Sequence, residues 1–321
     1  MIGALLFLAG GLLLLWKGAD LLVSGAVGIA ERLGISQLVV GLTVVAMGTS
    51  APEAAASVAA VLAGKGNIAI GNVFGSNIAN LALVGGVVAL IEPLQVRAQT
   101  LRREIPAMLI VALLLWPVLQ NLGVSRAEGL VFIAVFAALV VYTIRTARAG
   151  TPPTFIDKPP LPHAAHHDIR KDSAFLVVGL AGLTLGARLA ISGAVTIGRI
   201  AHLSDAVIGS TIMAVGTSLP ELITCVVAAL KGHHDISVGN LVGSNIFNTL
   251  LVTGTASIVR PFSVSARFAG GIDFWIMVGV GVGFALAVIA GRRIVGRLSG
   301  VLLLVAYGGY LVYLLAFTQA A

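Results

Sequence analysis

The sequence has little charge, one cysteine and few aromatic residues. Asp, Glu, Lys and Arg make up 10% of its 321 residues, compared with about 25% in an ordinary globular domain. Because Cys225 is the only cysteine, the chain cannot form an internal disulfide. Hydrophobic residues reach 58%, and the mean hydropathy is +1.04. This composition excludes a soluble enzyme, a disordered chain and a nucleic-acid-binding protein.

Apolar runs of membrane-spanning length recur along the whole chain. A helix needs about 20 apolar residues to cross a bilayer. The sequence divides into ten such runs, at 3–30, 37–64, 67–91, 104–121, 127–147, 173–199, 206–230, 236–259, 270–290 and 299–317. The one long polar connection is the proline-rich segment 148–172. The pattern predicts an all-α integral membrane protein with ten transmembrane helices.

The two halves of the chain repeat one another without a gap. Three motifs recur 168 residues later: GADLLVSGA (18–26) as GARLAISGA (186–194), GTSAPE (48–53) as GTSLPE (216–221), and GNVFGSNIAN (71–80) as GNLVGSNIFN (239–248). Each half contains five predicted spans, an odd number. The second half therefore has to enter the membrane in the opposite orientation, which is the inverted-topology repeat of many secondary transporters.

Two five-helix repeats, 1–147 and 173–321, are therefore expected on either side of a linker at 148–172. Lys and Arg are concentrated in the loops on the linker's side of the membrane, and such loops are usually cytoplasmic. Both termini are then expected outside, in a cell (inner or plasma) membrane.

The linker contains three histidines, between 163 and 167. We expect a solvated segment there rather than a metal site or pH sensor.

Two acidic residues, Glu53 and Glu221, lie near the middle of predicted spans, whereas most others lie in loops or near span ends. An unpaired carboxylate in the bilayer costs at least about 2–3 kcal/mol, so such residues usually face a cavity and mark an ion pathway. Because the two glutamates occupy equivalent repeat positions, we expect them to meet at the pseudo-two-fold axis.

Asp20 and Arg188 are also equivalent, with opposite charge. They are expected near helix ends or paired with each other.

A proline precedes each of these glutamates. Pro52 and Pro220 have no N–H to bond the carbonyl four residues earlier, so the second and seventh helices are expected to be broken. Irregular backbone at this depth is tolerated only where it is buried in protein or lines a cavity. Hydroxyl and carboxylate groups share one face of each broken helix, on Thr49, Ser50 and Glu53 and on Thr217, Ser218 and Glu221. Together with the freed carbonyls, such an all-oxygen site suits a hard cation such as Ca²⁺, and by extension Na⁺.

The next span of each half adds polar side chains four residues apart, Ser76 with Asn80 and Ser244 with Asn248. Each of these positions also has a purely structural interpretation. The Ser-x-x-Glu sequences at 50–53 and 218–221 are capping boxes. The serines would also allow close helix packing, and the asparagines would also form interhelical hydrogen bonds.

The paired GTSxPE and GNxxGSNIxN blocks resemble the two alpha-repeats of the sodium/calcium exchanger family, within the calcium/cation antiporter superfamily. The short central loop resembles that of its prokaryotic members. The resemblance implies a ten-helix antiporter that exchanges Na⁺ for Ca²⁺ by alternating access. It also implies ion binding midway through the membrane, between the second, third, seventh and eighth helices, while the first and sixth helices slide against the rest.

The resemblance implies a set of ligands as well. For Ca²⁺ these would be Glu53, Glu221 and the carbonyls of Thr49 and Thr217. Sodium would use overlapping oxygens, those of both glutamates, Ala46, Ala214, Thr49, Thr217, Ser50, Ser218, Ser76 and Ser244. Asn80 and Asn248 complete the set, although several relatives have Asp at the position of Asn248 and some at that of Asn80. The site therefore carries two formal negative charges, enough to neutralise one Ca²⁺.

Two other functions remain open at this stage. An H⁺/Ca²⁺ antiporter on the same scaffold would protonate the two glutamates instead of binding sodium, although GTSxPE differs from the GNxxE pattern expected of such proteins. A passive channel or membrane scaffold has no need of a duplicated acid pair in broken helices. We expect a transporter rather than an enzyme, without a cofactor. Its partners are Ca²⁺, Na⁺ and membrane lipid, and a monomer is expected to suffice because both half-sites are on one chain.

Overall fold

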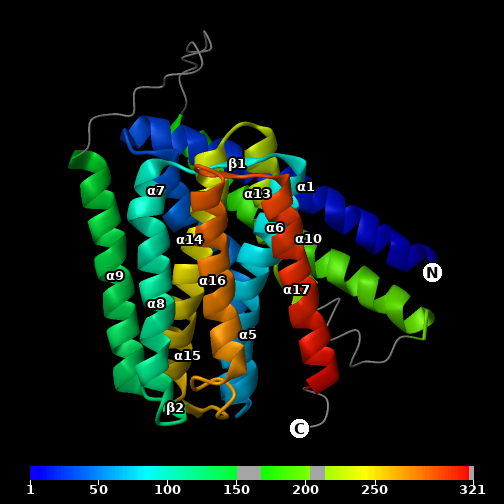
Figure 1. Cartoon of the computed structure of the whole chain (residues 1–321). Helices are drawn as coiled ribbons and strands as arrows, with labels where there is room; N and C mark the ends of the chain where they lie inside the picture. Colours follow the sequence, from blue (N-terminus) through cyan, green and yellow to red (C-terminus); the bar gives the residue numbers. More distant parts are fainter. Residues whose placement is uncertain (150–167, 203–213, 318–321) are drawn as a thin grey trace.

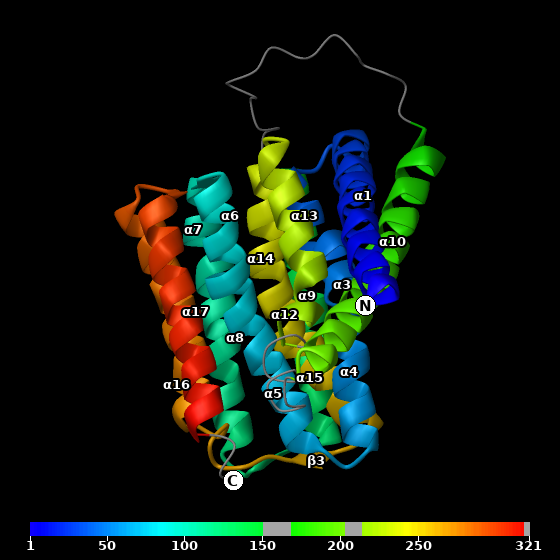
Figure 2. The same ribbon diagram turned by 90° about the vertical axis from the view of Figure 1, so that its right-hand side faces the viewer.

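The computed structural model describes residues 1–149, 168–202 and 214–317, which form a bundle of long helices (Figures 1 and 2). The first half contains α1 (Ile2–Leu33), α2 (Gln37–Val40), α3 (Ala46–Thr49), α4 (Ala51–Leu62), α5 (Gly66–Ile78), α6 (Gly85–Ile91), α7 (Ala98–Arg102), α8 (Glu104–Leu119) and α9 (Arg126–Ala149). The second half contains α10 (Ile169–Ile200), α12 (Ala214–Thr217), α13 (Leu219–Leu230), α14 (His234–Phe247), α15 (Thr253–Val259), α16 (Ile272–Ala290) and α17 (Arg297–Phe317). π-Helical segments join some of these helices: η1 (Gly41–Val45), η2 (Ala79–Val84) and η4 (Asn248–Val252).

Among the described residues, seven helices are long and apolar enough to cross a membrane, or eight if the bent pair Gln37–Thr49 and Ala51–Leu62 forms one span. These helices correspond to eight of the ten predicted spans. Of the other two spans, one contains α8, which has 16 residues. The other contains α12 and α13, and its residues before Ala214 lie outside the described part. The chain is therefore a helical, multi-pass membrane protein.

The helices on either side of the predicted linker extend into it. Helix α9 runs to Ala149, and α10 begins at Ile169. The early start of α10 has a local cause, because the Asp168 carboxylate accepts a hydrogen bond from Arg170 N at 3.0 Å and so caps the helix. The remainder of the linker, 150–167, with its three histidines, lies outside the described residues.

Two short antiparallel ladders lie at opposite ends of the bundle. β1 (Leu94–Gln95) pairs with β4 (Ile294–Val295), and β2 (Gly123–Val124) pairs with β3 (Phe262–Ser263). Figure 1 shows β1 at the upper end and β2 at the lower end. Each ladder joins a connection of the first half to a connection of the second. The two halves are thus tied together at both ends of the bundle.

Helices α1 and α10 lie side by side at one edge of the bundle, with their backbones in contact (Figures 1 and 2). A Cβ atom at Gly18 would lie 2.8 Å from the nitrogen of Leu183, and one at Gly186 would lie 2.7 Å from the nitrogen of Leu15. These two glycines are equivalent in the repeat. Small residues let helix backbones approach closely in a membrane, so this contact requires glycine in both halves.

The ion pair considered between Asp20 and Arg188 is not formed. Asp20 instead pairs with Lys231, the residue that follows α13, and Lys231 also donates a hydrogen bond to Ser24 Oγ at 3.2 Å. Arg188 is exposed on α10. Lys231 reaches Asp20 because α1 packs against α13, a tertiary contact that the repeat pattern does not reveal.

Replacing Gly18 by Ala is expected to lower the thermal stability of the purified protein, because the new methyl group would meet the α10 backbone at 2.8–2.9 Å. Overpacking of this kind typically costs about 1–3 kcal/mol. Gly10→Ala is the control on the same helix, since nothing lies within 4 Å of its added Cβ atom. Unfolding midpoints in detergent give the comparison, and equal midpoints for the two variants would contradict the backbone contact.

Candidate cation site

The second and seventh predicted helices are both interrupted at the GTSxPE motif. Ser50 separates α3 from α4 at φ −88° and ψ 6°, and Ser218 separates α12 from α13 at φ −88° and ψ 5°. The helical segments before and after Ser50 differ in direction by 44°. Each motif proline falls in the first turn of the new helix, where its missing N–H is not needed. The expected break is therefore present in both halves, with the same backbone conformation.

The two glutamates lie just after these breaks, and each is only 1% exposed. Ser50 Oγ donates a hydrogen bond to Glu221 Oε1 at 3.0 Å, so the motif of the first half contacts the carboxylate of the second. Ser50 stands three residues before Glu53 in the same motif. The structure therefore brings the two glutamates together from equivalent positions of the two halves.

Several buried polar atoms at the predicted positions have no hydrogen-bond partner among the described residues. They are Glu53 Oε2, Glu221 Oε2, Ser218 Oγ, Ser244 Oγ and the side-chain amides of Asn80 and Asn248. A buried polar group left unpaired costs about 1–3 kcal/mol. A bound cation would give the oxygens among these atoms a partner. Its ligands would then all be oxygens, with no nitrogen or sulfur.

Packing between the halves brings the segments with the asparagines against the segments with the glutamates. α13, which carries Glu221, packs against η2, which carries Asn80. In the same way, α4 with Glu53 packs against η4 with Asn248. Buried serines lie one turn before these asparagines, Ser76 on α5 and Ser244 on α14. Both asparagines sit in π-helical turns, which are frequent at functional sites.

The remaining predicted ligands lie on the short helices before the breaks. Thr49 is buried, and its hydroxyl donates to Asn240 Oδ1 at 3.1 Å and to the carbonyl of Ala46 at 3.4 Å. Thr217 ends α12 and Ala214 begins it, and the side chain of Ala214 lies outside the described part. The predicted ligands thus occupy equivalent elements in the two halves.

Two asparagines that the sequence analysis did not single out also contact this region. Asn240 accepts the hydrogen bond from Thr49, and Asn72 donates to the carbonyl of Glu53 at 3.1 Å. Both stand second in the GNxxGSNIxN block, 168 residues apart. A polar residue repeated at the same place in two apolar spans was the signal that could have identified them.

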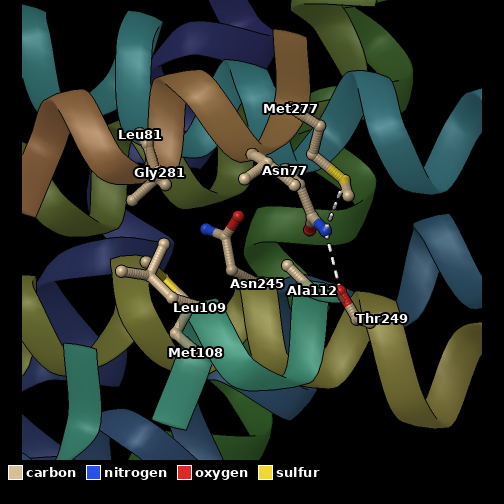
Figure 3. Close-up of a pocket in the computed structure, with 10 residues that line it drawn as sticks. Asn77, Leu81, Met108, Leu109, Ala112, Asn245, Thr249, Met277 and Gly281 are labelled. Carbon is tan, nitrogen blue, oxygen red and sulfur yellow. Dashed lines mark hydrogen bonds between the residues drawn. The ribbon is translucent and has the colours of Figure 1, made fainter. Parts of the chain in front are cut away.

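A small pocket on another face of α5 and α14 is lined by the asparagines of the GSN triplets. Asn77 Nδ2 donates to Thr249 Oγ1 at 2.9 Å, whereas Asn245 Nδ2 donates to the Leu241 carbonyl of its own helix at 2.8 Å. Figure 3 shows the Asn77 and Asn245 side chains among the residues that line this pocket. The counterpart of Thr249 in the first half is Leu81, so the two halves cannot form the same bond.

The charge of the cluster comes from the two glutamates alone. Within the described part of the chain, no three His, Cys, Asp or Glu side chains gather at one place, and the other side chains of the predicted site are neutral. When both carboxyl groups are ionised, one divalent or two monovalent cations balance them. Charges removed from water cost several kcal/mol each unless they are compensated. The arrangement therefore favours binding of hard cations.

Removing the Ser50 hydroxyl is expected to destabilise the cation-free protein more than removing the Ser218 hydroxyl. Ser50 donates to a carboxylate, and a bond to a charged group is worth about 1.5–3 kcal/mol. Ser218 Oγ has no partner among the described residues. Thermal unfolding of Ser50→Ala and Ser218→Ala in choline chloride makes the comparison, and an equal or larger loss in Ser218→Ala would contradict it.

Comparison with known sequences gives one consistent family. The family model for the sodium/calcium exchanger protein matches residues 3–145 and 172–316. The putative antiporter CaxA of Alkalimonas amylolytica is 39% identical over 318 residues, covering 97% of this chain and 98% of that protein. The sodium/calcium exchanger MaX1 of Methanosarcina acetivorans is 33% identical over 343 residues, covering 96% and 97%.

The fold also matches a solved structure over the full length. The sodium-calcium exchanger NCX_Mj, soaked with zero Na⁺ and Ca²⁺, aligns with a TM-score of 0.81 and 28% sequence identity, over 100% of this chain and 99% of that one. The duplicated motifs, the full-length relatives and the helical architecture agree with one another. This chain belongs to the sodium/calcium exchanger family.

Proposed function

We propose that this chain is a secondary active antiporter that exchanges Na⁺ for Ca²⁺ across a membrane by alternating access. One observation carries the proposal: two buried glutamates, Glu53 and Glu221, come together from equivalent positions of the two halves, and Ser50 bonds one half to the other. Family membership supports a cation/Ca²⁺ antiporter. The relative MaX1 is by its name a sodium/calcium exchanger.

Both ions would bind at one set of oxygens. Ca²⁺ would be held by Glu53, Glu221 and the carbonyls of Thr49 and Thr217. Na⁺ ions would use the two glutamates with Ala46, Ala214, Thr49, Thr217, Ser50, Ser218, Ser76 and Ser244, and Asn80 and Asn248 complete the set. The unpartnered buried oxygens of Glu53, Glu221 and Ser218 support this assignment.

Shared ligands account for exchange rather than free passage. Two neighbouring carboxylates in a dry site repel one another strongly unless cations lie with them. Ca²⁺ and Na⁺ therefore compete, and either ion leaves readily only when the other replaces it. The α1–α10 pair, in contact through its glycines, would slide against the rest of the bundle to open the site to each side in turn.

We further propose ten crossings in two inverted repeats, 1–147 and 173–321, with a cytoplasmic linker at 148–172. The ladders support this topology: β1–β4 joins two connections that are predicted on the same side, and β2–β3 joins two predicted on the other. The excess of Lys and Arg on the linker's side supports both termini being outside, in a cell membrane. Because both half-sites are on one chain, a monomer would suffice.

The topology is tested with single cysteines at Glu31, which is exposed at the end of α1, and at Lys65, which is exposed after α4. The native Cys225 is fully buried, so the maleimide is not expected to label it. In intact cells, a membrane-impermeant maleimide is expected to label Lys65→Cys, and to label Glu31→Cys only after permeabilisation. The reverse pattern would invert the proposed orientation, and labelling of both in intact cells would contradict the topology.

Transport is tested in proteoliposomes with ⁴⁵Ca²⁺ and with Na⁺, K⁺ or H⁺ gradients imposed separately. An outward Na⁺ gradient alone is expected to drive Ca²⁺ uptake. The Glu53→Ala, Glu221→Ala double variant is expected to lose this uptake, because no charge is left to hold Ca²⁺. Glu31→Gln, at an exposed carboxylate, is the matched control and is expected to transport normally.

Three results would overturn parts of the proposal. Ca²⁺ uptake driven by a pH gradient without sodium would favour the H⁺/Ca²⁺ antiporter, in which the glutamates carry protons on the return step. Uptake that persists in the double variant would place the binding site elsewhere. Single-channel currents in a planar bilayer would indicate a passive channel instead.

A further inference from the structure

Beyond the predicted ligands, a chain of buried hydrogen bonds leads away from the cation site. Thr49 Oγ1 donates to Asn240 Oδ1 at 3.1 Å, and Asn240 Nδ2 donates to Cys225 Sγ at 3.3 Å. The Cys225 thiol in turn donates to the carbonyl of Ser237 at 3.5 Å. All four residues are at most 1% exposed. The chain begins on α3 of the first half and ends on α13 and α14 of the second.

The first half contains two of these three hydrogen bonds at the equivalent positions. Asn72 Nδ2 donates to Ser57 Oγ at 2.9 Å, and the Ser57 hydroxyl donates to the carbonyl of Ala69 at 3.4 Å. Asn72, Ser57 and Ala69 each precede their counterparts, Asn240, Cys225 and Ser237, by 168 residues. Asn72 also donates to the carbonyl of Glu53 at 3.1 Å. The two inner hydrogen bonds therefore occur in both halves, but Asn72 ends on Glu53 of its own half, whereas Asn240 contacts Thr49 of the other half.

We propose that Asn240 is a positioning residue for the cation site, with Asn72 as its counterpart, and that it acts by fixing the backbone at Thr49. Thr49 is the last residue of α3, directly before the break at Ser50. Carbonyls at a helix end lack intrahelical partners and are free to bind other groups. By holding the Thr49 hydroxyl, Asn240 sets the direction of the adjoining carbonyls. This inference rests on the proposed function, because it assigns those carbonyls to Ca²⁺.

Two details of the contact support a positioning role. The Thr49 hydroxyl donates to Asn240 of the second half as well as to the Ala46 carbonyl of its own helix, so these two contacts together fix the direction of the side chain. The bond also crosses from one half to the other, so it holds the end of α3, just before the break, against α14. In metal sites, groups that orient the ligands typically change metal affinity by about 10–100-fold when they are removed.

The halves differ at one point, which provides matched variants. The first half has the hydroxyl of Ser57 where the second has the thiol of Cys225, and a thiol is a weak donor and acceptor. Cys225→Ala removes the acceptor for the Asn240 amide, while Cys225→Ser supplies the group that the first half uses. Both changes leave Asn240 and Thr49 in place.

The experiment measures the Ca²⁺ concentration for half-saturation, by ⁴⁵Ca²⁺ binding to the purified full chain. Asn240→Leu is expected to raise this concentration about tenfold or more. Thr49→Val, which keeps the carbonyl but loses the hydroxyl, is expected to have a similar effect. The Asn240→Leu, Thr49→Val double variant is expected to be no weaker than either single variant, because both changes break the same contact.

The control is Asn245→Leu, which changes a buried asparagine on the same helix whose amide donates to the Leu241 carbonyl of that helix. It is expected to shift half-saturation less than twofold. Cys225→Ala is expected to weaken Ca²⁺ binding, and Cys225→Ser to bind Ca²⁺ more tightly than Cys225→Ala. These two variants keep the test available if Asn240→Leu does not fold.

An Asn240→Leu shift no larger than that of Asn245→Leu would overturn the inference. So would additive losses in the double variant, since a group that only stabilises the bundle adds to other losses. Failure of the wild-type chain to bind Ca²⁺ would instead overturn the proposed function. The double-variant comparison can then be made on the cation-free unfolding midpoint, where additive losses would still contradict the Thr49–Asn240 contact.

Discussion

A carboxylate inside a membrane has to be compensated, and the centre of this bundle is organised around that requirement. Glu53 and Glu221 are buried from opposite halves of the chain, and Ser50 supplies Glu221 with a donor. The breaks at Ser50 and Ser218 interrupt the two helices just before each glutamate. Among the described residues, the buried polar atoms without a partner near the glutamates are mostly oxygens, and a bound cation can compensate these.

Some buried polar groups of each half are satisfied only by the other half. The Thr49 hydroxyl of the first half is held by Asn240 of the second, and the Asn77 amide by Thr249. The two ladders repeat this exchange at the ends of the bundle. Duplication therefore did more than supply a second glutamate, because each copy completes the hydrogen bonding of the other. This interdependence explains why one chain contains the whole cluster.

The family, the helical membrane fold, the helix breaks and the meeting of the glutamates could all be predicted from sequence. A proline beside an intramembrane glutamate predicts a broken helix at an ion pathway, and the sequence contains this pair of residues twice. The partner of Asp20 could not be predicted, because Lys231 reaches it only through the packing of α1 on α13. The role of Asn240 was missed for a similar reason. Its contact with Thr49 joins residues 191 positions apart, and no local pattern specifies such a pair.

The hydrogen bonds of the two halves are not identical, and this has an energetic consequence. In a carrier made of two inverted copies, the states open to either side interconvert as the copies exchange shapes. Equal copies would give both states the same free energy. Here the copies are unequal, because Thr249 corresponds to Leu81 and Cys225 corresponds to Ser57 in the alignment of the repeats. If the chain alternates as proposed, the empty carrier would therefore rest more often open to one compartment than to the other.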